Sequence, residues 1–174
     1  MSGAVGGRGV GKGMLVLAWI AGLVLATQLF GMWEKAQRNP NAQPQSVQGG
    51  NFVEVRLLRN GQGHFLANGQ INGEAVLFLL DTGATDVALP EHLARRLGLQ
   101  PGAALQLNTA NGQVTGYRAR LDSLALGDIR LRDVRAVIAP GMDGDEVLLG
   151  MSALRQLEFT QRDGTLVLRH YTDH

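Results

Sequence analysis

The chain has 174 residues, of which 45% are hydrophobic and 18% are charged, a composition typical of one globular domain with appendages rather than of a disordered protein. Sixteen lysines and arginines against fifteen aspartates and glutamates give a formal charge of +1, which argues against nucleic acid or another polyanion as a partner. The absence of cysteine excludes disulfides, a cysteine nucleophile and a cysteine-based zinc site within this sequence.

Residues 14–33 form an uncharged, apolar run near the N-terminus. At about 1.5 Å per residue, a helix of this length spans about 30 Å, the thickness of a bilayer core. We therefore expect a transmembrane helix over 14–33 after a leader of residues 1–13. The alternative is a cleaved signal peptide, because Arg8 and Lys12 make the leader basic and residues 24–26 offer small side chains. The free amino terminus favours an orientation with the rest of the chain outside, which in a bacterial inner membrane is the periplasm.

Small residues recur within this run at every fourth position, at Ala18, Gly22 and Ala26. This spacing places them on one face of a helix, where the backbones of two helices can approach closely. The pattern predicts a face for helix pairing in a membrane, although alanine and glycine are also common in such helices for other reasons.

The next segment, residues 34–50, is rich in Gln, Asn, Pro and Gly and has no apolar period, which predicts a flexible linker. From residue 51 to residue 174, short apolar runs alternate with turn signals. Asn-Gly and Asp-Gly pairs supply the positive φ angles of tight hairpins, and hairpin turns are expected at Asn60-Gly61, Asn68-Gly69, Asn72-Gly73, Asn111-Gly112 and Asp163-Gly164. The pattern predicts a mostly β domain, a small closed barrel or sandwich with one or two short helices.

The clearest helix signal begins at Pro90, which precedes a short amphipathic stretch that ends at Gly98. A second short helix is expected directly after Gly150. Apolar residues of the strands between these helices are expected in the core: Leu124, Leu126, Ile129, Leu131 and Val134.

Asp81 stands at the end of the apolar run 76–80 and is followed by Thr82 and Gly83. A carboxylate at the end of a buried strand must be hydrogen-bonded, paired, or held in an altered protonation state. Two such carboxylates about 3 Å apart share one proton, so that one can activate a water molecule while the other protonates a carbonyl oxygen. The competing structural interpretation is an aspartate that caps its own turn by accepting downstream amides.

The sequence here resembles the retropepsin-like aspartic proteases of clan AA. The stretch VLFLLDTGA, residues 76–84, resembles their active-site motif, and VLLG, residues 147–150, resembles the second signature that packs beneath the active-site loop. The stretch NTANGQVTG, residues 108–116, stands where that family has its flap. The order of these features is most similar to the bacterial membrane-anchored branch, whose members carry an N-terminal transmembrane helix.

The resemblance implies a retropepsin-like fold and an aspartic endopeptidase that hydrolyses peptides or proteins. It implies Asp81 as the catalytic residue, Thr82 and Gly83 as residues that shape the dyad, and Asn111 and Gly112 as the flap. Asp86 stands where related enzymes contact the substrate backbone, and a solvated or turn-bonding aspartate fits that position equally well. Neither a metal nor a cofactor is implied, and the four histidines lack the spacing of a metal site: His64, His92, His170 and His174.

A second Asp-Thr-Gly motif is missing from the 174 residues, since Asp122-Ser123 is followed by Leu124 where glycine is needed. The expectation is a homodimer that places one Asp81 from each subunit across a two-fold axis. The alternative from another class is a non-catalytic dimerisation or peptide-binding module that has the same fold.

Overall fold

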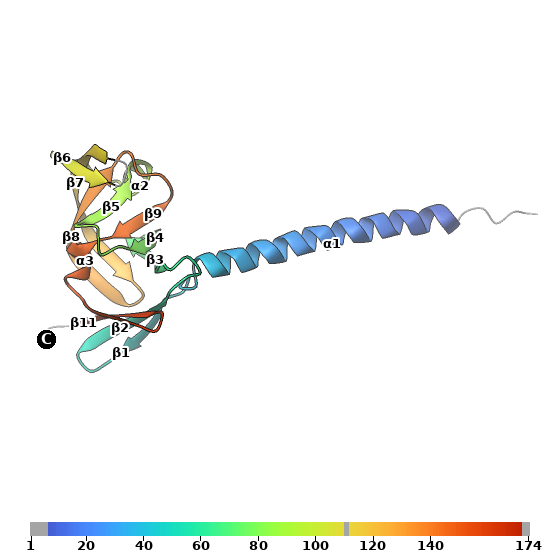
Figure 1. Cartoon of the computed structure of the whole chain (residues 1–174), viewed down its shortest axis with the longest axis horizontal. Coiled ribbons are helices and arrows are strands. Elements are labelled where there is room, and N and C mark those ends of the chain that lie inside the picture. The colour runs from blue at the N-terminus through green and yellow to red at the C-terminus, as the bar shows by residue number, and fades with distance from the viewer. Residues whose placement is uncertain (1–6, 110–111, 172–174) are drawn as a thin grey trace, which may run out of the picture. The chain divides into compact units, whose positions relative to one another are not determined.

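The computed structural model describes residues 7–109 and 112–171 of the chain (Figure 1). The chain divides into two compact units, Met1–Gln37 and Arg38–His174, and each is described by itself.

The described part of the first unit is helical: helix α1 runs over Gly7–Arg38, and only its last residue belongs to the second unit. Its segment Gly13–Arg38 is, among the described residues, the one helix long and apolar enough to cross a membrane, a test that an N-terminal signal sequence also passes. The helix runs past residue 33, where the sequence predicted its end. Residues 34–38 are Glu, Lys, Ala, Gln and Arg, all strong helix formers, so the helix continues although the apolar run has stopped.

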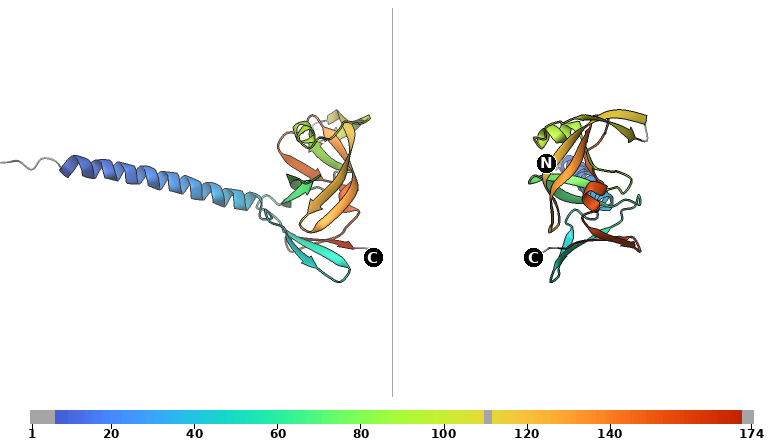
Figure 2. Two further views of the ribbon diagram at one scale, coloured as in Figure 1. Left: turned by 180° about the vertical axis from the view of Figure 1, so that it is seen from behind. Right: turned by 90° about the vertical axis from the view of Figure 1, so that its left-hand side faces the viewer.

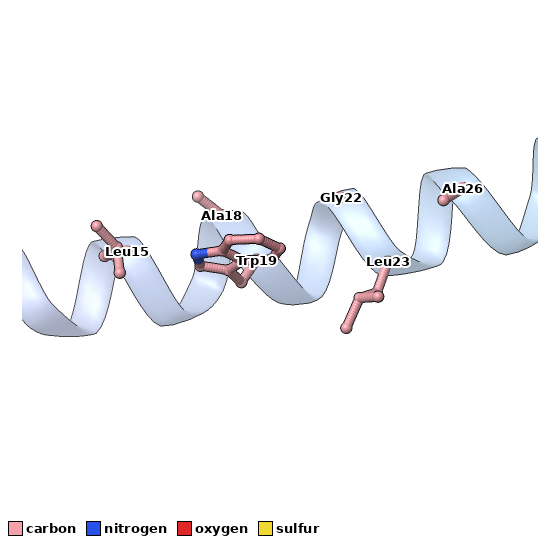
Figure 3. Close-up of a pocket in the computed structure, with 6 residues that line it drawn as sticks. All are labelled: Leu15, Ala18, Trp19, Gly22, Leu23 and Ala26. Atoms are coloured by element: carbon pink, nitrogen blue, oxygen red, sulfur yellow. The ribbon is translucent and has the colours of Figure 1, made fainter.

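A shallow groove follows one face of α1 (Figure 3). The small residues Ala18, Gly22 and Ala26 follow one another along this face, and larger apolar side chains flank them: Leu15, Trp19 and Leu23. The groove results from missing side-chain volume, since nothing lies within 4 Å of a Cβ atom added at Gly22.

The second unit is mostly β, as the sequence predicted. Its described strands form two sheets. The smaller sheet has the order β1-β2-β11-β10, with β1 at Gln45–Gln48, β2 at Phe52–Leu58, β10 at Glu158–Arg162 and β11 at Thr165–Tyr171. The larger sheet has the order β3-β4-β9-β5-β8-β7-β6, with β3 at Leu66–Ile71, β4 at Glu74–Leu80, β5 at Val87–Pro90, β6 at Ala104–Thr109, β7 at Gly112–Leu126, β8 at Ile129–Ala139 and β9 at Glu146–Leu149.

The larger sheet closes on itself, because β3 pairs with β7 as well as with β4. The closing contacts are Gln70 opposite Ala125 and Ile71 opposite Leu124. Closure leaves the β6–β7 hairpin as an extension of the barrel, and Figure 2 shows the smaller sheet as a separate layer at one end of it. The predicted closed β-barrel is confirmed.

The core fills the barrel and the space toward the smaller sheet. The five residues expected there are buried: Leu124, Leu126, Ile129, Leu131 and Val134. Helix α2, Glu91–Arg96, buries Leu93 and Ala94, and Gly98 ends the helical stretch with a φ of 68°, as predicted. Pro90 is the N-cap of α2 rather than its first residue.

Two of the predicted hairpin turns are formed by the residues themselves. Asn72 and Gly73 have φ angles of 51° and 86° between β3 and β4, and Asp163 and Gly164 have φ angles of 49° and 75° between β10 and β11. These values are those of the two-residue turns that match the twist of antiparallel strands.

Two other predicted turns are wrong. Asn68-Gly69 lies inside β3, where a Cβ atom at position 69 would lie 2.4 Å from the carbonyl oxygen of Ala125, so glycine is needed for a close strand crossing. Asn60-Gly61 lies in a loop between strands of different sheets. There the Asn60 side chain is buried and accepts the backbone amides of Gln62 and His64.

The segment 34–50 departs from the predicted flexible linker. Besides the end of α1, it contains strand β1, which pairs with β2. Between them, Asn41 is buried: its amide donates to the carbonyl oxygens of Leu58 (2.8 Å) and Leu66 (2.7 Å), and its Oδ1 accepts the Leu58 amide at 2.7 Å. These bonds satisfy backbone groups of β2 and β3 that have no strand partner on that side.

Three more asparagines complete what we call the asparagine clasp, Asn39, Asn41, Asn60 and Asn68. Asn60 donates to the carbonyl oxygen of Arg38 at 3.0 Å, and Asn68 donates to that of Ala42 at 3.0 Å. Asn39 donates to Asn68 and accepts the amide of Asn41. Residues 38–42 are thereby bound to the domain by side-chain hydrogen bonds, a role that their polar composition concealed.

Candidate active site

Asp81 lies where two parallel strands end together. Strand β4 pairs with β9 in parallel, and the last pair of their register is Leu80 with Leu149. The Asp81 amide donates to the carbonyl oxygen of Leu149 at 3.3 Å, and the Leu80 amide donates to that of Phe65 at 3.0 Å. The apolar run 76–80 therefore ends with its backbone fixed on both sides, and the first residue beyond it is the aspartate.

The Asp81 carboxylate caps its own turn. Its Oδ1 accepts the backbone amide of Gly83 at 2.8 Å, and its carbonyl oxygen accepts that of Ala84 at 3.3 Å. A Cβ atom at position 83 would lie 3.1 Å from Oδ1, so glycine gives the carboxylate room. The turn-capping interpretation is thus correct for one oxygen. Oδ2 accepts no hydrogen bond from any residue that the structure describes, and Asp81 is partly exposed.

Gly150 supports the loop from below. A Cβ atom at this position would lie 2.2 Å from the carbonyl oxygen of Asp86 and 2.7 Å from that of Ala84, so only a hydrogen fits. Helix α3, Met151–Leu154, starts here, and its first amides are aimed at the loop. Met151 donates to the Ala84 carbonyl oxygen at 2.8 Å, which fixes the loop next to the aspartate.

Ser152 is a positioning residue that the sequence did not indicate. Its amide donates to the carbonyl oxygen of Thr85 at 3.0 Å, and its Oγ accepts the amide of Val87 at 3.0 Å and donates to the carbonyl oxygen of Arg135 at 2.7 Å. Its role depends on the backbones of β5 and β8, which no local pattern reveals.

A cavity of about 250 Å³ opens beside the aspartate. Asp81 and Thr82 form one wall, and the others come from the barrel and the smaller sheet: Phe65, Leu80, Leu154, Phe159, Gln161, Leu166 and Leu168. The Thr82 hydroxyl makes no hydrogen bond with the described part of the chain and is exposed. The structure thus brings together three of the predicted site residues, Asp81, Thr82 and Gly83, with two groups left available for a partner.

Asp86 does not line that cavity. Its Oδ1 lies 3.5 Å from Nε of Arg135, close enough for attraction, yet receives no hydrogen bond from a described residue although it is shielded from solvent. It lines a second and larger cavity on the side of β7 and β8.

The hairpin expected to act as the flap is formed by β6 and β7, whose pairing runs from Ala104 with Tyr117 to Thr109 with Gly112. Gly112 has a φ of 108°, a conformation that favours glycine. Asn111 lies outside the described residues.

Comparison with known proteins bears directly on this site. A sequence model of the family described as "gag-polyprotein putative aspartyl protease" matches residues 67–156, a range that includes the Asp81 loop, the β6–β7 hairpin and Gly150. A crystal structure of a retropepsin-like aspartic protease from Rickettsia conorii has a TM-score of 0.58 and 26% identity, covering 75% of this chain and 96% of that one.

Two curated relatives are also similar. An uncharacterized protein of the cobV 5′ region of Sinorhizobium sp. is 34% identical over 111 residues, which are 62% of this chain and 48% of that protein. An uncharacterized protein of Rickettsia prowazekii (strain Madrid E) is 31% identical over 121 residues, 68% of this chain and 52% of that protein. The chain spans about half the length of the curated relatives it matches.

Proposed function

The chain belongs to the gag-polyprotein aspartyl protease family and has a retropepsin-like fold, and from this premise we propose that it is an aspartic endopeptidase acting on peptides or proteins. The observation that carries the proposal is the state of Asp81. One carboxylate oxygen is fixed by the Gly83 amide, the other lacks a partner among the described residues, and Asp81 lines a cavity. A fixed but incompletely bonded carboxylate is suited to general acid–base chemistry.

The second carboxylate would come from Asp81 of another copy of the chain, so that the two oxygens face each other across a two-fold axis. The available Thr82 hydroxyl next to Asp81 supports this arrangement, because it can bond to the partner's loop. The cavity beside Asp81 is also consistent with a second copy. Its wall includes Phe159 and Gln161 of β10, an edge strand whose residues are exposed in the single chain and which a partner could therefore cover.

In the proposed reaction the two carboxylates share one proton. The ionised carboxylate takes a proton from a water molecule as the water oxygen bonds to the carbonyl carbon of the peptide, and the protonated carboxylate donates to the carbonyl oxygen. The tetrahedral species then collapses. The carboxyl that holds the water proton passes it to the nitrogen, the other carboxylate takes a proton from one hydroxyl, the C–N bond breaks, and a carboxylic acid and an amine leave with the pair again sharing one proton. Asn111 and Gly112 would close over an extended substrate and exclude water from the site.

We further propose that α1 anchors the enzyme in a membrane, with the protease domain in the periplasm of a bacterium. The length and apolar surface of α1 support the anchor. Reporter fusions after residue 50 would test this, because a reporter active in the cytoplasm contradicts the orientation. A mature chain that begins after residue 26 would instead identify α1 as part of a cleaved signal.

The test of catalysis uses the 174-residue chain in detergent or nanodiscs with a library of unlabelled peptides, read by mass spectrometry. We expect Asp81→Asn to lower the cleavage rate by roughly 10³-fold or more, because one ionisable group of a cooperating pair is removed from each subunit. Asp122→Asn is the matched control, since Asp122 is exposed and lies in the near-miss motif. Equal cleavage by the wild type and Asp81→Asn would refute the proposal, and specific peptide binding without cleavage by the wild type would favour the non-catalytic module.

Pair formation has its own measurement. Specific activity should rise with protein concentration in the range where the dimer forms, and it should show a bell-shaped pH dependence, because the reaction needs one protonated and one ionised carboxylate. Constant specific activity in a preparation shown to be monomeric would rule out the dimeric mechanism.

A further inference from the structure

The second cavity, of about 500 Å³, lies at the far end of the Asp81 loop. The loop contributes Thr85 and Asp86, the segment before β6 contributes Gly102, and the adjacent strands β7 and β8 contribute three arginines, Arg118, Arg120 and Arg135. A volume of this size accommodates a side chain of a bound peptide together with its backbone.

The arginines of this cavity differ in how far their charge is neutralised. Arg120 makes a two-pronged ion pair with Asp133, which has a positive φ of 57° and lies opposite Asp122, where the pairing of β7 with β8 is interrupted without a change of register. The hydrogen bonds from Arg120 lower the pKa of the Asp133 carboxyl, so this partner stays ionised. Arg120 is therefore fully paired and has little attraction left for a ligand.

The positive charges of the other two arginines, Arg118 and Arg135, are not fully neutralised by carboxylates. Arg135 reaches one oxygen of Asp86 at 3.5 Å without a hydrogen bond. Arg118 forms no ion pair with any residue between 7 and 171 that the structure describes. Three arginines against Asp86 and Asp133 leave one uncompensated positive charge at the cavity, and a single negative charge complements it.

The cavity borders both the Asp81 loop and the base of the β6–β7 hairpin, the two segments between which the proposed endopeptidase would hold its substrate. Asp86 follows Asp81 by five residues in the same loop, and Arg118 stands at the base of the β6–β7 hairpin. There the Gly102 amide donates to the Arg118 carbonyl oxygen at 2.8 Å and the Arg118 amide donates to that of Ala103 at 3.0 Å, which extends the hairpin pairing toward the loop. An extended peptide between hairpin and loop would leave the site past these side chains.

We propose that this cavity binds a carboxylate side chain, Asp or Glu, of the polypeptide substrate, several residues away from the cleaved bond. Arg118 is the principal contact and Arg135 the secondary one. The assignment rests on the proposed endopeptidase function, which it deepens by naming a substrate class.

The experiment separates binding from cleavage by using the 174-residue chain with the Asp81→Asn substitution in nanodiscs. The probes are fluorescent peptides that share one apolar centre, each carrying a single Glu, Gln or Lys placed three to six residues to either side of that centre. Anisotropy gives the affinity, and parallel cleavage assays use the protein with Asp81 intact. Arg118 is changed to Gln and to Glu, and Arg132→Gln serves as control because Arg132 is an exposed arginine of β8 outside the cavity.

We expect one position at which the Glu peptide binds about three- to fivefold more tightly than the Gln peptide, the range reached by exposed ion pairs. Arg118→Gln should remove this preference, Arg118→Glu should transfer it to the Lys peptide, and Arg132→Gln should keep it. A preference for the Glu peptide that is unchanged in both Arg118 variants would overturn the proposal. So would displacement of the Glu and Gln peptides to the same extent by inorganic phosphate, because the anion would then not compete specifically with the Glu carboxylate. If binding follows the expected pattern but no peptide is cleaved with Asp81 intact, the cavity assignment stands and the endopeptidase proposal fails.

Discussion

Asp81 and Asn41 are both polar residues beside strands of the same domain, but the structure uses them in opposite ways. Asn41 is buried, and both ends of its amide are bonded to β2 and β3. Asp81 is partly exposed, and the described residues bond only one of its carboxylate oxygens. The fixed parts of the Asp81 loop are its backbone groups, which β9 and α3 hold. The side chain of Asn41, which holds the fold, has its hydrogen bonds made, whereas Asp81, which is suited to chemistry, is held largely through its neighbours.

The strongest test of this contrast removes the support of the loop and leaves Asp81 in place. In Gly150→Ala the added Cβ would overlap the carbonyl oxygens of Ala84 and Asp86, so the loop must move. We expect a loss of roughly 1–3 kcal/mol in the free energy of unfolding and a cleavage rate lower by roughly 10²-fold, because a small displacement of a catalytic group has a large effect on rate. Gly61→Ala is the control, since its Cβ would meet nothing within 4 Å. Full activity in Gly150→Ala would mean that the loop needs no such support.

Because the hydrogen bonds of the Asn41 side chain are all made within the fold, we expect its removal to lower stability. Asn41→Ala leaves the Leu58 amide and the carbonyl oxygens of Leu58 and Leu66 without their partner. We expect about 2–4 kcal/mol less stability in chemical denaturation. The matching change at the other residue, Asp81→Asn, should shift the free energy of unfolding by less than about 0.5 kcal/mol.

Asn51→Ala, at an exposed asparagine before β2, serves as the reference for Asn41→Ala. A larger stability loss in Asp81→Asn than in Asn41→Ala would reverse the roles that we assign to the two residues.

Glu54 is a carboxylate that, unlike Asp81, is buried and bonded to two arginines, so its contribution to stability should depend on pH. This buried carboxylate of β2 accepts hydrogen bonds from Arg169 (2.7 Å) and Arg56 (2.8 Å), and these bonds lower its pKa from the ordinary value of 4.5. A lowered pKa in the folded state means that the stabilisation is complete above pH 4.5 and is lost as the pH falls through the folded value.

Glu54→Gln should therefore be roughly 1–3 kcal/mol less stable than the wild type at about pH 6.5, and the gap should narrow at about pH 3. Urea unfolding at both pH values measures the gap, with Glu74→Gln as the control because Glu74 is an exposed residue of β4. A gap that stays constant with pH would show that the ion pairs of Glu54 contribute nothing.

The smallest expected effect concerns α1, whose groove of small residues offers apolar rather than polar contacts. In a membrane, Gly22→Leu would fill the groove and weaken self-association about fivefold. Gly31→Leu introduces the same side chain nine residues farther on, two and a half turns, and thus on the opposite face. Energy transfer between labelled chains in liposomes measures the association. Equal effects of the two substitutions would exclude a specific pairing face.

The sequence predicts best what depends on neighbouring residues. The turns at Asn72-Gly73 and Asp163-Gly164 need only their own φ angles, and the Asp81 turn needs only the Gly83 amide, so both could be predicted. Asn68-Gly69 looks like these turns in sequence, but the need for glycine at position 69 comes from the close approach of β7, more than fifty residues later in the chain. The acceptors of Asn41 and the partners of Ser152 are likewise backbone groups of distant strands. Composition alone made residues 38–42 resemble part of a linker.

The asparagine clasp has a consequence for the depth at which the proposed protease can work. Between Trp33, where the apolar run ends, and Arg38, the first clasped residue, the chain has four residues. Even fully extended, a tether of four residues spans only about 14 Å, whereas the seventeen residues of the expected linker would span about 60 Å. If α1 lies in a bilayer as proposed, the attachment point of the protease domain stays within about 14 Å of the end of the apolar run.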